Sequence, residues 1–211
     1  MKTEDLIKGL AADRTRGMAQ DSAWLIALLA GSMMAAITFF ALLGLRPDFA
    51  NAMETIRFIF KFVITIVLSA TAWAALRALS TPAAPARSAV LMLLVAPAML
   101  GAAAVAEIMI LPEGERMARM IGTNNLLCLL AIPAIGAVPL AIFIAALRYG
   151  APSDPGRAGM VAGILAGAVA ATFYAAHCTD DSPLFVIVWY TLAIAILAGV
   201  GALAGRCAVR W

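Results

Sequence analysis

Long apolar runs, separated by short polar stretches, make up most of the chain. Six of these runs hold about 20 residues or more, with almost no charged side chain among them. A helix of about 20 apolar residues crosses the roughly 30 Å hydrocarbon core of a bilayer. The pattern therefore predicts an all-α integral membrane protein with six transmembrane helices and short loops. The predicted spans are residues 24–45, 57–79, 88–111, 120–147, 158–176 and 184–204.

A few polar and kink-forming residues refine this picture. Lys61 lies close enough to the start of the second span for its ammonium group to reach outward to the membrane surface. Pro97 predicts a bend in the third span, and residues 112–119 are predicted to form a polar loop. Glu107, about one turn before the end of the third span, is either a functional group inside the membrane or a side chain that reaches water.

The first 22 residues carry a different pattern. Leu6, Ile7 and Leu10 share one face at helical spacing, and Thr3 is a suitable N-cap. A short amphipathic helix is therefore predicted over Glu4–Arg14. A helix of this length is marginal by itself in water, so it needs a partner. Because its polar face carries both charge signs, it suits a partner protein better than a lipid surface.

Lysine and arginine are unevenly distributed between the two sides of the predicted bundle. The side with the N-terminus holds ten of the 15 basic residues, and the opposite side holds five. Because positively charged loops stay in the cytoplasm, both termini are predicted to be cytoplasmic. The chain is then a multi-pass protein of the bacterial inner membrane, with a cytoplasmic segment, 1–22, and a six-helix transmembrane domain, 23–211. The loop that contains His177 faces the periplasm.

Composition agrees with this class. Apolar residues make up 64% of the chain and charged residues 13%, against about half and a quarter in soluble domains. The basic residues behind the net charge of +3 are mainly topology signals, so no direct binding of nucleic acid is expected. The first apolar run is longer than the core of a signal peptide and is predicted to be retained. Three cysteines without a CxxC pair argue against a zinc ribbon and a thioredoxin-type motif.

The most unusual stretch chemically is Ala175–Pro183, with the sequence AAHCTDDSP. It contains the only histidine of the chain, His177, together with Cys178, Asp180 and Asp181. Long apolar runs flank it on both sides. A polar turn between two helices is the plain structural interpretation. The alternative is a chemical sensor at the outer surface.

A second cysteine strengthens the sensor interpretation. Cys128 lies about eight residues into the fourth span, roughly 10 Å deep. It can come within disulfide distance of Cys178 only if the fourth and fifth helices are neighbours or Cys178 turns inward. Thiolate and imidazole ligands suit Cu(I) and zinc, so Cys128, Cys178 and His177 form a hypothetical metal site. Oxidation of the thiols is the alternative.

The third cysteine, Cys207, is separated from the other two. Cys207 lies beyond the sixth span, about 30 Å of helix from Cys178, and is expected to be inert. Any metal ion would act as a transient signal, and no resident cofactor is expected. The chain shows no paired nucleophile and base and no Gly-rich phosphate loop, so an enzyme is not predicted.

A small six-helix transporter or metal-handling protein is the alternative function. Such a protein would place polar or charged groups near the middle of several spans. Here the middle of the spans carries only hydroxyl groups such as those of Thr65 and Thr172. Gly159, Gly163 and Gly167 repeat at four-residue spacing, which favours close packing inside the bundle over dimerisation. The oligomeric state is otherwise open.

Several sequence blocks resemble one known family. They are MKTEDLIKGLAADRT at the start, LLGLRPD after the first span, HCTDDSPLFVIVWYTL between the fifth and sixth spans, and the closing RW. Together they are similar, from end to end and in the same order, to the NrsF family of six-span membrane anti-sigma factors. The block HC-x-x-D-S-x-x-F-x-x-x-W-Y is the most specific of them.

The resemblance implies a function and a partner. An extracytoplasmic-function sigma factor of a proteobacterium would be held inactive at the membrane by the N-terminal segment. The residues expected to bind it are Leu6, Ile7, Leu10 and Arg14. Two outward cysteines, matching Cys128 and Cys178, would sense metal or oxidative stress and release the sigma factor. His177, Asp180 and Asp181 complete the expected sensing group.

Overall fold

A computed structural model describes residues 20–81 and 86–208. The amphipathic helix predicted over Glu4–Arg14 lies outside the described residues. Every regular element in the described ranges is helical. The elements are α2 (Gln20–Leu42), α3 (Phe49–Ala52), α4 (Ile56–Ser80), α5 (Ala86–Met92), α6 (Val95–Ile110), α7 (Glu113–Ile121), α8 (Asn125–Ala146), the 3-10 turn η1 (Leu147–Tyr149), α9 (Pro155–Ala175), α10 (Pro183–Phe185), the π-helical η2 (Val186–Tyr190) and α11 (Thr191–Ala208).

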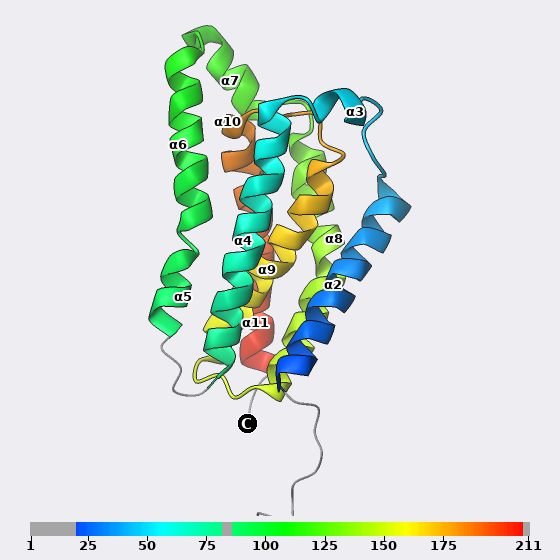
Figure 1. Cartoon of the computed structure of the whole chain (residues 1–211), viewed down its shortest axis with the longest axis vertical. Coiled ribbons are helices and arrows are strands. Elements are labelled where there is room, and N and C mark those ends of the chain that lie inside the picture. The colour runs from blue at the N-terminus through cyan, green and yellow to red at the C-terminus, as the bar shows by residue number, and fades with distance from the viewer. Residues whose placement is uncertain (1–19, 82–85, 209–211) are drawn as a thin grey trace, which may run out of the picture.

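Six helical stretches are long and apolar enough to cross a membrane, as the sequence predicted. They form a bundle in which α9 is the most buried span, with α4, α8 and α11 packed around it. The first span, α2, packs mainly on α8, and the third span, α5 and α6, lies at the edge beside α4 (Figure 1). The fourth and fifth spans, α8 and α9, are thus neighbours.

Small residues explain why α9 and α11 pack so closely. A Cβ atom at Gly159 would collide with the carbonyl oxygen of Gly201, and one at Gly163 would collide with that of Leu197. The glycines of α11 are restricted in the same way, because a Cβ atom at Gly205 would collide with the carbonyl oxygen of Pro155 in α9. The glycine repeat therefore serves packing inside the bundle, and this prediction is confirmed.

The third span is interrupted slightly before the predicted bend. α5 ends at Met92 and α6 begins at Val95. Pro97 has no N–H group, so it cannot donate to the carbonyl four residues earlier, at Leu93. Leu93 and Leu94 instead donate to carbonyls three residues back. The break is thus the expected proline effect, displaced toward the N-terminus.

The prediction of a polar loop at residues 112–119 was wrong, because most of this stretch belongs to the short helix α7. Glu113 and Glu115 lie in its first turn and Arg119 in its last turn, where each charge suits the helix dipole. Pairs at helical spacing join Arg116 to Glu113 and Arg119 to Glu115. The fourth span consequently begins later than predicted, as α8 at Asn125.

Three connections meet at one end of the bundle, at the top of Figure 1: residues 43–55, 111–124 and 176–182. We call this end the cysteine end, because it contains Cys178. The opposite end, the terminal end, holds Gln20 and Ala208. The indole N–H of Trp189 donates to the carbonyl of Met120 at 3.0 Å, which joins the α7 connection to the sixth span.

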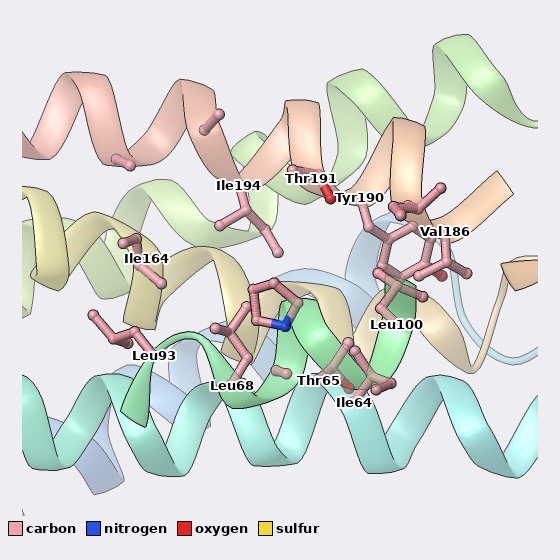
Figure 2. A pocket seen from close by; sticks show the side chains of 15 residues that line it. Ile64, Thr65, Leu68, Leu93, Leu100, Ile164, Val186, Tyr190, Thr191 and Ile194 are labelled. Atoms are coloured by element: carbon pink, nitrogen blue, oxygen red, sulfur yellow. The ribbon is translucent and has the colours of Figure 1, made fainter. Parts of the chain in front are cut away.

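An apolar groove separates the third span from the sixth. Its volume is about 390 Å³, and it is bordered by α4, by Leu93 and α6, by α9 and by η2 and α11. Figure 2 shows Leu93 and Leu100 of the third span facing Tyr190 and Ile194 of the sixth across this space. The third span is therefore the least tightly held part of the bundle along its middle.

Candidate functional site

The segment Cys178–Leu184, here called the junction segment, is the polar centre of the cysteine end. It connects the fifth span to the sixth and makes polar contacts with four other parts of the described chain. These parts are the first connection, α4, α6 and the start of α8. The stretch singled out in the sequence is therefore the place where the helix connections are tied together.

Two buried cations hold the first half of this segment. The ammonium group of Lys61 lies 2.5 Å from Asp181 and donates to the carbonyl of Cys178 at 2.9 Å. The guanidinium of Arg46 pairs with Asp181 at 3.0 Å and with Asp48 at 2.6 Å, and it also donates to the Cys178 carbonyl. Lys61 is only 1% exposed, so the prediction that it reaches the membrane surface was wrong.

The charges perturb the acid–base behaviour of the groups in the connections. The hydrogen bond to Asp48 raises the pKa of Arg46, with Asp181 adding to the effect, although burial opposes it. The same hydrogen bond from Arg46 lowers the pKa of Asp48. Burial raises the pKa of the Cys178 thiol, and the Lys61 ammonium only partly offsets this. Cys178 is therefore a protonated thiol at neutral pH.

Asp180 caps the fourth span. Its carboxylate accepts hydrogen bonds from the backbone N–H groups of Thr123 at 3.0 Å and Asn124 at 2.8 Å, and from the Asn124 side chain at 2.9 Å. A carboxylate at the start of a helix satisfies its unpaired N–H groups and complements its dipole. Asp180 thereby links the segment that carries Cys178 to the helix that carries Cys128.

Glu107 connects the third span to the second half of the junction segment. The hydroxyl of Ser182 donates to Glu107 at 2.6 Å, and the backbone N–H of Leu184 donates at 3.2 Å. The other carboxylate oxygen pairs with Arg57 at 3.1 Å. Glu107 was predicted to be either a functional group inside the membrane or a side chain that reaches water. The second alternative is wrong, because Glu107 is only 5% exposed.

Cys128 and Cys178 are both completely buried and both free thiols. Each lies within electrostatic range of the other or of the Lys61 ammonium. The structure therefore brings the two predicted cysteines into one buried region at the cysteine end. Cys207 is exposed in the last turns of α11, near the terminal end, and takes no part in this region.

His177 does not complete a metal site here. Its Nδ1 donates to the carbonyl of Gly44 at 3.0 Å. Among the described residues, no three histidine, cysteine or acidic side chains lie close enough together to hold a metal ion. The metal site of Cys128, Cys178 and His177 therefore stays a hypothesis, and in this structure His177 contacts Gly44 while Asp180 and Asp181 contact Asn124 and Lys61.

Two tyrosines near the cysteines were missed by sequence reasoning. Tyr174 and Tyr190 are 0% and 2% exposed, and their ring centroids lie 5.8 Å apart. Tyr174 also accepts, through its carbonyl, a hydrogen bond from the backbone N–H of Cys178 at 3.0 Å. The sequence carried two signals, since Tyr174 precedes Cys178 by about one helical turn and Tyr190 closes the block HC-x-x-D-S-x-x-F-x-x-x-W-Y. Tyr190 lies on another helix, so its proximity depends on packing that a single sequence does not reveal.

Comparison with known proteins gives a consistent result. The family model described as "NrsF: Negative regulator of sigma F" matches residues 10–211. The chain is 33% identical over 217 residues to "Anti-sigma-F factor NrsF" of Caulobacter vibrioides (strain NA1000 / CB15N), with 100% of both chains covered. It is 35% identical over 218 residues to "Probable anti-sigma-F factor NrsF" of Azospira oryzae (strain ATCC BAA-33 / DSM 13638 / PS), again with 100% of both covered. No solved structure matches.

Proposed function

The chain belongs to the NrsF family of negative regulators of sigma F, and from this premise we propose that it is a membrane-bound anti-sigma factor controlled by its two buried cysteines. Its partner is an extracytoplasmic-function sigma factor, which it holds inactive at the inner membrane. The full-length similarity to proteins named as anti-sigma-F factors is the observation that carries this proposal.

The N-terminal segment is the proposed binding site for the sigma factor. Leu6, Ile7 and Leu10 form the apolar face of its predicted helix, and Arg14 lies at the end of that helix. A short amphipathic helix gains stability by laying its apolar face into a groove of a partner. With both termini in the cytoplasm, residues 1–22 are on the side where sigma factors act.

The junction segment is the proposed sensor. Its hydrogen bonds to Lys61, Glu107 and Asn124 connect it to the second and third spans and to the start of the fourth. A displacement of Cys178 would therefore change contacts with all three spans. A metal ion bridging Cys128 and Cys178, or an oxidant acting on the two thiols, would shift this segment. Release requires only that the shift favours the free state of the sigma factor by a few kcal/mol.

The mid-span hydroxyls argue against the transporter alternative. Thr65, Ser69 and Thr172 each donate to the carbonyl four residues earlier in their own helix. Hydroxyls used in this way are satisfied locally and offer no series of free polar groups along the described spans. An anti-sigma factor needs no such path.

A binding experiment tests the anti-sigma function. Full-length protein in nanodiscs is mixed with the candidate sigma factor, and the complex is recovered through a tag on the membrane protein. We expect Leu6→Asp and Leu10→Asp to abolish recovery, while Lys8→Gln, on the polar face, retains it. Undiminished recovery by a chain lacking residues 1–22 would contradict the proposed binding site. Substrate flux in proteoliposomes without any sigma partner would support a transporter instead.

A reporter experiment tests the sensing role separately. Transcription from a sigma-dependent promoter is measured in cells after exposure to metal ions or oxidants. We expect Cys128→Ser and Cys178→Ser to change the response, whereas Cys207→Ser leaves it at the wild-type level. A normal response from both Cys128→Ser and Cys178→Ser would remove the sensing role and leave sigma binding intact.

A further inference from the structure

We propose that Tyr174 and Tyr190 are positioning residues of the sensor, whose hydroxyl groups donate hydrogen bonds to the Cys178 sulfur as negative charge develops on it during reaction. The inference rests on the sensing role proposed above and extends it from the two thiols to the groups that make a buried thiol reactive. It is carried by the position and the hydrogen bonding of these two side chains.

Both tyrosine side chains are deeply buried, and their rings lie near the residues that flank the junction segment, 6.3 Å from His177 for Tyr174 and 6.4 Å from Phe185 for Tyr190. Tyr174 is in the last turn of α9, and the backbone N–H of Cys178 donates to the Tyr174 carbonyl at 3.0 Å. This bond fixes Cys178 directly after the turn that presents the Tyr174 ring. Tyr190 packs against Tyr174 from the sixth span, and its ring lies 6.4 Å from that of Phe185. The two rings thus approach Cys178 from two different spans.

Neither hydroxyl has a satisfied hydrogen bond. Within residues 20–81 and 86–208, the oxygens of Tyr174 and Tyr190 are among the few buried side-chain atoms with no hydrogen-bond partner. Buried polar groups are almost always paired, so each exception needs an explanation. A neutral thiol is a weak acceptor, whereas a charged sulfur is a strong one. The two donors are therefore suited to the reacting state of Cys178.

The local helix geometry supports a specific role for Tyr190. It ends the π-helical stretch η2, which interrupts the sixth span directly after the junction segment. A π-helical turn is rare, and such turns occur frequently at functional sites. The extra residue in the turn changes the direction of the side chains that follow. Here Tyr190 packs against Tyr174 and also borders the apolar groove (Figure 2).

The charged side chains nearby are already engaged by other groups. Lys61 is the closest cation, but its ammonium is already engaged by Asp181 and by the Cys178 carbonyl. Arg46 is likewise engaged by Asp48 and Asp181. A buried sulfur that gains negative charge needs donors that are not already in use. The two tyrosine hydroxyls fit this requirement.

The test measures the reaction of Cys178 with a small thiol reagent. Full-length protein in nanodiscs is treated with methyl methanethiosulfonate, and each cysteine is followed by peptide mass spectrometry. The Cys178 sulfur bonds to the CH3S group, methanesulfinate leaves, and the thiol proton passes to the buffer. Tyr174→Phe and Tyr190→Phe remove only the hydroxyl groups. Tyr149→Phe is the matched control, because Tyr149 is 55% exposed at the terminal end.

We expect each of the two buried variants to slow the modification of Cys178 roughly tenfold, the effect of one hydrogen bond to a charged atom. The Tyr149→Phe rate and the rate at Cys207 stay unchanged. The midpoint of thermal unfolding is unchanged or higher, since an unpaired hydroxyl is removed. Wild-type rates in Tyr174→Phe and Tyr190→Phe would overturn the inference. So would faster modification together with a lower unfolding midpoint, which would make the hydroxyls structural.

These outcomes are independent of the sensing role itself. If the tyrosine variants slow the modification of Cys178 but modified protein still binds the sigma factor, the sensing role fails and the tyrosine inference stands. If the rates are unchanged and the cysteine variants still lose the cellular response, only the tyrosine inference fails.

Discussion

At the scale of single residues, Gly122 decides where the fourth span starts. Its φ of +60° lies in the region that favours glycine, and it separates α7 from α8. A Cβ atom there would collide with the ring of Phe185 and lie 2.9 Å from the carboxyl carbon of Asp180. The close approach of the junction segment to the start of α8 therefore depends on this residue.

The first prediction follows from this geometry. Gly122→Ala should lower the free energy of unfolding by about 3 kcal/mol, from backbone strain together with overpacking. Gly114→Ala is the control, because a Cβ at Gly114 in α7 meets nothing within 4 Å. It should be neutral or stabilising by up to about 1 kcal/mol. Chemical denaturation in detergent micelles measures both, and equal stabilities would contradict the prediction.

The ion pair between Arg46 and Asp48 gives a pH-dependent prediction. The folded-state pKa of Asp48 is lowered, so the pair contributes stability above the unfolded value of about 3.9, and this contribution is lost as the pH falls through the folded pKa. The thermal midpoint of Asp48→Asn should therefore fall below that of wild type near pH 7, and the two should converge in acid. A difference between them that stays constant from pH 7 to acid would contradict this assignment.

The residues of the site were only partly predictable from the sequence. The stretch around Cys178 stood out by its composition, because such residues are rare between apolar runs, and the sensing role of Cys128 and Cys178 stays a prediction. The partners did not follow, since Lys61 and Tyr190 lie on spans whose packing a single sequence does not specify. The metal site of Cys128, Cys178 and His177 stays a prediction, and the contact of His177 with the Gly44 carbonyl was not foreseeable from the sequence.

At the scale of elements, the contact between α9 and α11 holds the two most closely packed spans together. Glycines on both helices allow the backbones to approach, which increases van der Waals contact in a membrane where no hydrophobic force joins helices. The groove beside the third span has no comparable contact. Stability is therefore concentrated on one side of the bundle.

A matched pair of substitutions in α11 tests this view. Gly201→Ala should lower the free energy of unfolding by about 1–3 kcal/mol, because its Cβ would collide with the carbonyl of Gly159. Gly199→Ala, two residues away, meets nothing within 4 Å and should be neutral or stabilising. Denaturation of both variants in the same detergent makes the comparison. A larger loss for Gly199→Ala would contradict the packing argument.

The spans were predicted well because long apolar runs have few alternatives to crossing a membrane. Their ends were less predictable, since a helix ends where local contacts change. In α7, alternating charges suggested a loop, but the pairs at helical spacing and the charges placed along the dipole stabilise a helix instead. In the third span, a bend was predicted at Pro97, and the helix is in fact interrupted a few residues earlier, between Met92 and Val95.

At the scale of the whole molecule, buried charges tie the connections together at the cysteine end. Breaking such a pair leaves a charge without its partner in a buried site, which is strongly destabilising. Lys61→Met should therefore lower the free energy of unfolding by about 3 kcal/mol, despite the remaining contact of Asp181 with Arg46. Adding Asp181→Leu should restore part of the loss, and denaturation of the single and double variants measures the coupling. A double variant no more stable than Lys61→Met would contradict this explanation.

The orientation of the whole molecule in the membrane can also be tested. In a cysteine-free background, Glu115→Cys at the cysteine end should react with a membrane-impermeant maleimide in intact spheroplasts. Arg157→Cys at the terminal end should react only after lysis. Both side chains are exposed, at 58% and 76%, so access to the compartment decides the result. The reverse pattern would place the cysteine end in the cytoplasm and contradict the proposed sensor.

The length of α4 adds a mechanical consequence to the position of Lys61. The helix has 25 residues, about 37 Å, and Lys61 lies in its second turn. Its far end is joined to the connection before α9 by the bond from Ala151 to the carbonyl of Ser80. A rigid rod pivoting by about 5° near one tip moves its other tip by about 3 Å over this length. A small tilt of the second span about its Lys61 end would therefore produce a larger displacement at its Ser80 end.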